Sequence, residues 1–241
     1  MSRSNADVPV PPWRKSRKSV PLRRQLSQDL IVEAGLRILD AEGLDGLSMR
    51  RVAQELDTGP ASLYAHVANK EELLELIYDR VLGEIRLPEP DPSRWKEQLR
   101  EYAIEVYRVL GEHADVARAG LASVPMGPNA LRVGEYVFGL LIEAGMTPRD
   151  AALGVDRLAL YISGDAYEGS LHFAKMRAAG QEVEEYFRAF VGQIEGYYRS
   201  LPAEMFPHTT KHVDVMIAED GRARFEFGLD LLLDGLTARM P

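Results

Sequence analysis

The strongest constraint on the fold is a short segment in which a turn of three residues joins two helices. Ser48 is a good N-cap, and the apolar residues after it, up to Leu56, have the spacing of one face of a short helix. Residues 57–59 (Asp-Thr-Gly) form the turn, and Pro60 suits the first position of a new helix, where its missing N–H is not needed. Two short helices joined in this way indicate a helix-turn-helix.

A longer helix precedes this pair and another follows it. Ser27 is an N-cap, and the apolar residues after it recur at helical spacing until Gly43, which ends the first helix. Asn69 caps the later helix, with Glu72 three residues on in the manner of a capping box, and its apolar face continues to Ile85. The first of these helices is expected to support the pair from behind.

Prolines alternate with acidic residues over residues 88–92, and this pattern disfavours helix. Beyond this break almost everything has helical periodicity, whereas no alternating strand pattern occurs. The expected helices cover residues 95–112, 129–144, 148–179, 182–200 and 222–239. An interruption of the third near Gly164 or Gly169 stays open, and the segment after Pro207 is expected to be a loop.

The predicted fold is therefore all-α, in three parts. Residues 1–26 form a basic N-terminal arm, and residues 27–87 form a three-helix helix-turn-helix domain with its connecting helix. Residues 88–241 form a second helical domain. In a helix-turn-helix the second helix presents its first residues to the major groove of DNA.

The distribution of charge bears on the DNA hypothesis. The chain of 241 residues has a net charge of −8, which taken whole argues against nucleic acid. Residues 1–26, however, contain seven basic residues and one acidic residue. Such an arm attracts phosphates without sequence preference; a solubilising tail is the alternative.

The composition excludes several other classes of protein. The chain has no cysteine, so it forms no disulfide and has no thiolate metal site or cysteine nucleophile. No apolar run reaches 18 residues, and no apolar core follows the N-terminal basic stretch. We expect a cytoplasmic protein without a membrane-spanning segment or a signal peptide.

Three stretches closely resemble the DNA-binding segment of the tetracycline-repressor (TetR) family. They are residues 48–56 (SMRRVAQEL), 59–66 (GPASLYAH) and 69–73 (NKEEL), and the pattern L-Y-x-H-x-x-N-K is quite specific to that family. A looser resemblance to the tetracycline-repressor subtype continues through Trp95 to residues 225–236. The resemblance implies a homodimeric regulator of transcription, expected to be a repressor that a small-molecule inducer releases from a palindromic operator. It also implies that residues 88–241 form the domain for ligand binding and dimerisation.

The same resemblance implies the residues that contact DNA. They are Ser48, Arg50, Gly59, Pro60, Ala61, Ser62, Tyr64, His66 and Lys70. Tyr64, His66 and Lys70 are expected at phosphates, Lys70 next to a helix N-terminus. Arg50 can take a guanine bidentately, and Ser62 is expected to reach a base edge. Taken singly, Tyr64 is more often a half-buried packing residue and His66 an ordinary surface histidine.

The last helix has more apolar surface than one buried stripe needs. A palindromic operator requires a two-fold dimer, so an interface with a second copy is the favoured interpretation. The expected interface residues are Leu158, Phe225, Leu229, Leu232 and Leu236. A purely internal core helix is the alternative.

The effector cannot be named from the sequence. In the tetracycline-binding members a polar cluster and a histidine-held magnesium recognise the drug, but Arg86, Tyr102, Val106 and Gly120 depart from that pattern. Tetracycline with magnesium is therefore not the expected ligand, and no cofactor is expected. Candidate residues for lining an apolar effector cavity are Tyr102, Val106, Met126, Tyr136, Tyr161 and His172, each of which could instead be plain core.

Three other functions compete with this interpretation. A transcriptional activator, and a DNA-binding protein that responds to no ligand, would each have the same helix-turn-helix. A helical metal-dependent enzyme is remote: only His113 with Asp115, and His208 with His212, suggest a metal, and two ligands make a weak site. The sequence contains none of the common catalytic or phosphate-binding motifs. We predict neither a metal site nor catalysis.

Overall fold

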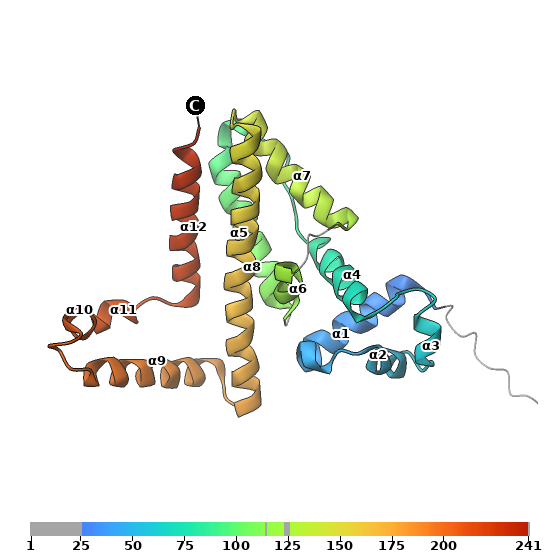
Figure 1. The fold of residues 1–241 in the computed structure, drawn as a ribbon, viewed down its shortest axis with the longest axis horizontal. Helices are drawn as coiled ribbons and strands as arrows, with labels where there is room; N and C mark the ends of the chain where they lie inside the picture. Colours follow the sequence, from blue (N-terminus) through green and yellow to red (C-terminus); the bar gives the residue numbers. More distant parts are fainter. Residues whose placement is uncertain (1–25, 114, 123–125, 241) are drawn as a thin grey trace, which may run out of the picture.

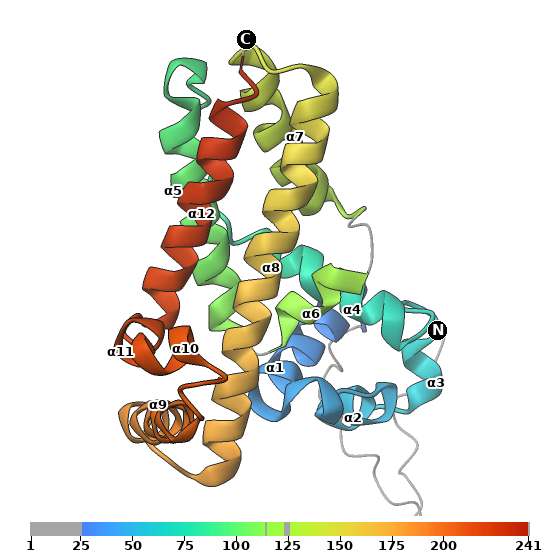
Figure 2. The same cartoon turned by 60° about the vertical axis from the view of Figure 1, so that its left-hand side comes forward.

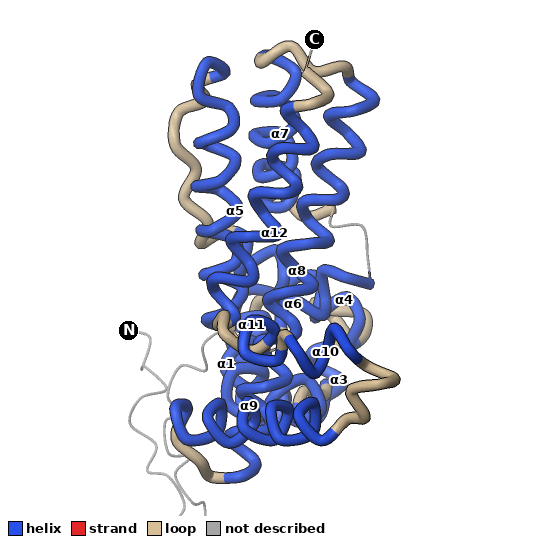
Figure 3. Tube along the Cα trace, turned by 90° about the vertical axis from the view of Figure 1, so that its left-hand side faces the viewer, coloured by secondary structure: helices blue, strands red, loops and turns tan. Residues whose placement is uncertain are grey.

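The computed structural model describes residues 26–113, 115–122 and 126–240, so the basic arm lies outside the described residues except for Leu26. Every regular element in this part is a helix, which confirms the predicted all-α class (Figures 1 and 3). The elements are α1 (Gln28–Gly46), α2 (Met49–Glu55), α3 (Pro60–Leu63), α4 (Lys70–Leu82), the 3-10 helix η2 (Pro92–Arg94), α5 (Trp95–Glu112), α6 (Val116–Ala122), α7 (Pro128–Glu143), α8 (Pro148–Ala179), α9 (Val183–Ser200), α10 (Pro207–Lys211), α11 (Val213–Met216) and α12 (Gly221–Thr237).

The first three helices form a head, defined here as α1, α2 and α3. Ser27 caps α1, because its hydroxyl accepts a hydrogen bond from the Leu30 N–H at 3.3 Å. The helical path breaks at Gly43, whose φ of 74° lies in the left-handed region that suits glycine, and one further turn follows. The predicted end of the first helix at Gly43 corresponds to this break.

The body, defined as α5 to α12, is built on four upright helices: α5, α7, α8 and α12 (Figures 1 and 2). The longest is α8, whose 32 residues pass through Gly164 and Gly169 without interruption. Its last turns reach the level of the head. Helix α9 runs across that end of α8 and has no buried residue. Within the described residues, no helix is both long enough and apolar enough to cross a membrane.

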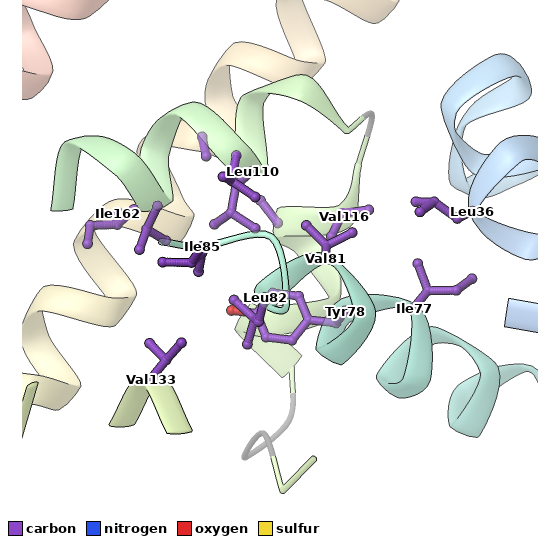
Figure 4. Packing of buried hydrophobic residues seen from close by; sticks show 14 of the residues in the cluster. Leu36, Ile77, Tyr78, Val81, Leu82, Ile85, Leu110, Val116, Val133 and Ile162 are labelled. Atoms are coloured by element: carbon purple, nitrogen blue, oxygen red, sulfur yellow. The ribbon is translucent and has the colours of Figure 1, made fainter. Parts of the chain in front are cut away.

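Helix α4 connects head and body, and it packs on α1 as well as on α6 and α7. One continuous hydrophobic core results (Figure 4). In it Leu36 of α1 lies near Ile77 of α4, and Val81 of α4 lies near Leu110 of α5 and Val116 of α6. Because interiors are close-packed, a shift of α4 on one side must be accommodated on the other. The head is therefore mechanically joined to the body.

Two predictions about the body were incomplete or wrong. Helix α6 was not predicted, because it is only seven residues long and buries Val116 and Ala117 against the body. The segment after Pro207 was expected to be a loop, but it forms α10. The proline stands at the first position of that helix, where it starts rather than breaks the helix.

Candidate nucleic-acid interface and effector cavities

Helices α2 and α3 form the predicted helix-turn-helix. The Ser48 hydroxyl accepts a hydrogen bond from the Arg51 N–H at 3.2 Å and so caps α2. The Thr58 N–H donates to the Ala53 carbonyl at 2.9 Å, which closes the turn before α3. Leu63 and Val67 are buried and anchor α3 to the head. The opposite side of α3 is consequently directed away from the protein.

That outer side contains the residues expected to reach DNA. Gly59 is the N-cap of α3 and Pro60 its first residue, and both are exposed, as are Ala61 and Ser62. The Tyr64 ring is 54% exposed, more than a packing residue would be. A small-residue surface followed by an exposed tyrosine can approach a groove closely while the hydroxyl reaches a phosphate.

Two adjacent arginines on α2 have different surroundings. Arg51 forms ion pairs with Glu42 at 2.8 Å and with Glu55 at 3.1 Å, which raise the pKa of its guanidinium. Arg50 is exposed and has no carboxylate partner within the described part of the chain. Of the two, Arg50 is the one whose charge and donors are available to a base.

The start of α4 forms the other edge of this surface. The Asn69 side chain caps α4 by accepting from the Glu72 N–H at 2.8 Å, while the Glu72 carboxylate accepts from the Ala68 N–H rather than from that of Asn69. The Lys70 ammonium donates to the Leu44 carbonyl at 3.2 Å, so it also ties α4 to the end of α1. His66 is half-buried, and its carbonyl accepts from the Gln28 side chain.

The residues expected around an effector do not gather at one place. Tyr102 and Val106 are buried on α5, and the Tyr102 ring lies 6.5 Å from the ring of Tyr136 on α7. The Tyr136 hydroxyl is buried and has no hydrogen-bond partner within the described residues. Burial raises the pKa of both phenols, so they stay protonated and can donate. A buried donor without a partner is a place where a ligand atom can bind.

A separate cavity of about 450 Å³ lies between α5, α8, α9 and the start of α12, and His172 lines it. Its wall is rich in aromatic side chains, and carboxylates stand beside them: Tyr107, Phe173, Phe187 and Phe190, with Asp165, Glu168, Glu219 and Asp220. Burial, aided by the charge of Glu168, raises the pKa of Asp165. Size and apolar lining fit a small-molecule site.

The other two effector candidates lie elsewhere. The Tyr161 hydroxyl donates to the Phe225 carbonyl at 2.7 Å and its ring stacks on the Phe225 ring, so Tyr161 ties α8 to α12. Met126 is 74% exposed. At Gly120, a Cβ atom would lie 2.5 Å from the Tyr78 ring, so a histidine at this position would displace that buried ring.

The expected dimer residues are largely internal to the protomer. Leu158, Phe225 and Leu229 are almost fully buried in its core, and Leu232 and Leu236 pack against that core. Buried side chains offer no surface to a second copy. The exposed large apolar residues of α8 and α12 are others, namely Leu153, Leu160, Leu171, Phe173, Phe227 and Leu231. The sequence could not separate the two faces of α12, because leucine and phenylalanine occupy both.

The two histidine motifs differ in their surroundings. Among the described residues, no group of three or more histidine, cysteine or acidic side chains could hold a metal ion. His113 lies between the carboxylates of Asp40 and Glu84, which approach opposite ring nitrogens. His208 lies within the short helix α10, His212 follows its last residue, and both are exposed.

A helix-turn-helix with an exposed reading surface, joined through α4 to a helical body with cavities, defines a DNA-binding regulator of transcription. The tetR family model of bacterial regulatory proteins matches residues 31–77, and the model of the tetracyclin repressor-like C-terminal domain matches residues 87–240. The chain belongs to the TetR family, as the sequence pattern predicted.

Individual relatives agree with this assignment. The HTH-type transcriptional repressor DrrR1 of Streptomyces coeruleorubidus is 33% identical over 88% of this chain and 77% of its own. The class D tetracycline repressor protein of Escherichia coli is 26% identical, with 90% and 91% covered. The crystal structure of ActR from Streptomyces coelicolor in complex with actinorhodin is 43% identical, covers 89% of this chain and 97% of its own, and superposes with a TM-score of 0.78.

Proposed function

We propose that this regulator is a repressor that binds a palindromic operator as a homodimer and is released by a small-molecule effector. The observation that carries the proposal is the exposed row on α2 and α3, formed by Arg50, Ser62 and Tyr64. Repression is supported by the similarity to DrrR1, which is a transcriptional repressor, and control by a ligand is supported by the actinorhodin complex of ActR.

We infer that the second copy packs on α8 and α12. These helices lie side by side, and their exposed leucines and phenylalanine are spaced to share one face of each helix: Leu153 with Leu160, and Phe227 with Leu231. Two such faces related by a two-fold axis form a bundle of four helices. The two heads would then lie on the same side of the dimer, as half-sites about 34–36 Å apart require.

For the effector we favour the contact between α5 and α7, where the rings of Tyr102 and Tyr136 lie 6.5 Å apart. The buried Tyr136 hydroxyl lacks a partner within the described residues, so an effector with an acceptor group there would gain a hydrogen bond in an apolar setting. Magnesium-bound tetracycline is disfavoured, because Tyr78 occupies the space that a histidine at position 120 would need. An effector that binds better to one orientation of α4 would change operator affinity by its differential binding.

The test of DNA binding is selection from a random duplex library by the purified protein. Enrichment of a palindrome is expected, and it should be lost in Ser62→Ala with Tyr64→Ala. Lys70 is left in place, because its ammonium also bonds to the Leu44 carbonyl and its loss would affect the head itself. The control is Tyr197→Ala, an exposed tyrosine on α9. No enrichment at low salt by folded protein would overturn the proposal.

The selected operator then tests the effector site. Actinorhodin, the compound bound in the ActR structure, is the first probe for release of operator. If it releases the wild-type protein, Tyr136→Phe should need more of it, whereas Tyr197→Ala should not. Equal release of both variants would remove Tyr136 from the site. Repression itself requires a reporter gene behind the operator, where increased expression on addition of the protein would instead indicate an activator.

A further inference from the structure

The head contacts the body at a second place besides α4, through the residues that follow α5. His113 ends α5, and its ring lies between a carboxylate of the head and one at the end of α4. Its Nδ1 is 3.1 Å from Oδ2 of Asp40 on α1, and its Nε2 is 3.2 Å from Oε2 of Glu84, just after α4. The side chain is only 14% exposed, so solvent screens these contacts weakly.

This geometry specifies the number of protons on the ring. A neutral imidazole donates from one nitrogen only, so its other lone pair would face a carboxylate; the imidazolium donates from both. The hydrogen bond with Asp40 raises the pKa of His113 against the opposing effect of burial, and that with Glu84 adds to it. Burial alone would raise the pKa of Glu84, but hydrogen bonds from His113 and Arg80 outweigh it and lower it.

Further contacts hold the same joint together. The Asp115 carboxylate accepts from the Leu44 N–H at 3.0 Å and from the Ser170 hydroxyl at 3.2 Å, so it bonds to the end of α1 and to α8. Arg177, in the last turn of α8, donates to the Asp40 carbonyl at 3.1 Å. The charged groups that face His113 directly are therefore Asp40 from α1 and Glu84 from the end of α4. Arg177 of α8 stands behind Asp40. The Arg80 guanidinium stands behind Glu84, to which it bonds at 2.8 Å, and it also bonds to Glu33 at 2.7 Å.

Helix α5 connects this cluster with the α5–α7 contact at which we place the effector. Tyr102, Val106, Leu110 and His113 follow one another at intervals of four, four and three residues, so they lie on one face of the helix. Tyr102 and Val106 are both buried, and the Tyr102 ring lies 6.5 Å from that of Tyr136 on α7. Leu110 belongs to the core shared with α4 and α6 (Figure 4). A displacement of α5 at its effector end would move His113 relative to Asp40.

We propose that His113 is a positioning residue for DNA binding: with Asp40 and Glu84 it forms a proton-dependent latch that fixes the orientation of the head on the body. The latch is closed when the imidazole is protonated and loosened when it is neutral. Protonation of His113 and binding of the effector then act on the same contact between head and body. Protonation favours the orientation of the head that this structure shows. This inference rests on the proposed function, because it assumes that the orientation matters for the operator.

The first measurement needs no DNA. Because the folded-state pKa of His113 is raised, the latch contributes fully to stability below the ordinary histidine pKa of about 6.5 and is lost as the pH rises through the folded-state pKa. The free energy of unfolding of the wild-type protein should therefore fall over this window relative to His113→Gln. His212→Gln, an exposed histidine after α10, is the control and should follow the wild type.

The second measurement is the affinity for the selected operator between pH 6 and 8.5. All three proteins keep His66 and differ only at the substituted histidine. Wild type and His212→Gln should lose affinity more steeply than His113→Gln, with up to about a tenfold excess for each pKa unit by which DNA binding shifts His113. Asp40→Asn should behave as His113→Gln does, and it serves in its place if the latter does not fold.

The outcomes separate the latch from the proposed function. Identical pH profiles of affinity in wild type and His113→Gln would overturn the latch even if both proteins bind the operator. A loss of stability in His113→Gln that is the same at every pH would also overturn it, because it would show a merely structural contact. If the library selection yields no operator but the pH dependence of unfolding is as expected, the proposed function is contradicted and the proton-dependent contact is still supported.

Discussion

Arg50 and Arg51 are neighbours in the sequence, but only one of them is available to DNA. Since Glu42 and Glu55 pair with Arg51, the specific contact is expected from Arg50. Arg50→Ala should weaken operator binding by about 1–3 kcal/mol and relax the preference at one base pair of each half-site. Arg51→Ala, the matched control, removes exposed ion pairs of small energy and should keep the preference. Affinities for a set of single-base operator variants measure both effects, and a loss of preference in Arg51→Ala alone would reverse the assignment.

Gly120 shows how a glycine can be required by a neighbour rather than by its own backbone. A Cβ there would lie 2.5 Å from the buried Tyr78 ring, so Gly120→Ala should lower the free energy of unfolding by about 1–3 kcal/mol through overpacking. Gly111→Ala is the same change near the end of α5, with no atom within 4 Å of the added carbon. It should be neutral or stabilise by up to about 1 kcal/mol. Urea unfolding at one protein concentration tests the contrast, which equal effects of the two changes would contradict.

The elements differ in how well local sequence specifies them. Helices α2, α3 and α4 were predicted because each begins with a cap or proline within its own segment: Ser48, Pro60 and Asn69. Helix α6 was missed because it depends on burial against the body, which no local signal encodes. The exposed residues of α2 and α3 could be predicted because they belong to one short local motif, and their contacts with DNA stay a prediction. The effector residues could not be predicted in this way, because a cavity is formed by side chains distant in the sequence. Tyr161 and Tyr136 have equivalent sequence patterns, yet the Tyr161 hydroxyl bonds to the Phe225 carbonyl and that of Tyr136 has no partner within the described residues.

Helix α12 has an exposed apolar face, opposite its buried one, that is expected to pack on a second copy. Phe227 is 68% exposed and Leu231 follows it by one turn. Burial of each side chain is worth about 1.5–3 kcal/mol. Phe227→Asp with Leu231→Asp should therefore raise the dimer dissociation constant by about a hundredfold or more and convert the protein to monomer at micromolar concentration. Sedimentation velocity measures this. Val215→Asp, an exposed valine on α11, is the control; if the double variant remains dimeric, α12 does not form the interface.

At the scale of the whole molecule, the core couples the head to the body, whereas the distribution of charge opposes DNA binding over most of the surface. One continuous core extends from α1 through α4 to the body, so a change at either end can be transmitted by packing. The net charge of −8, by contrast, repels DNA from most of the surface. Seven basic residues within residues 1–26 oppose this repulsion, and they precede the head directly in the sequence. The head supplies specificity, and the N-terminal arm is expected to supply much of the non-specific attraction.

This division of labour predicts how salt affects binding. Each phosphate neutralised by a basic side chain steepens the dependence of log affinity on log salt by about 0.9. If two arm residues per protomer contact phosphates, removal of residues 1–24 should make the slope of the dimer shallower by about 3–4 and lower the affinity most at low salt. Titrations of the selected operator at several salt concentrations measure the slope.

A full-length variant with the seven basic arm residues replaced by glutamine separates charge from chain length, and it should match the truncated protein. The base preference should survive both changes, because Arg50 and Ser62 remain on the head. A truncated protein with unchanged affinity and slope would mean that the head and its helix N-termini overcome the acidic surface alone. The arm would then have no part in DNA binding, and the contacts of Tyr64 and Lys70 with phosphates would have to supply the attraction.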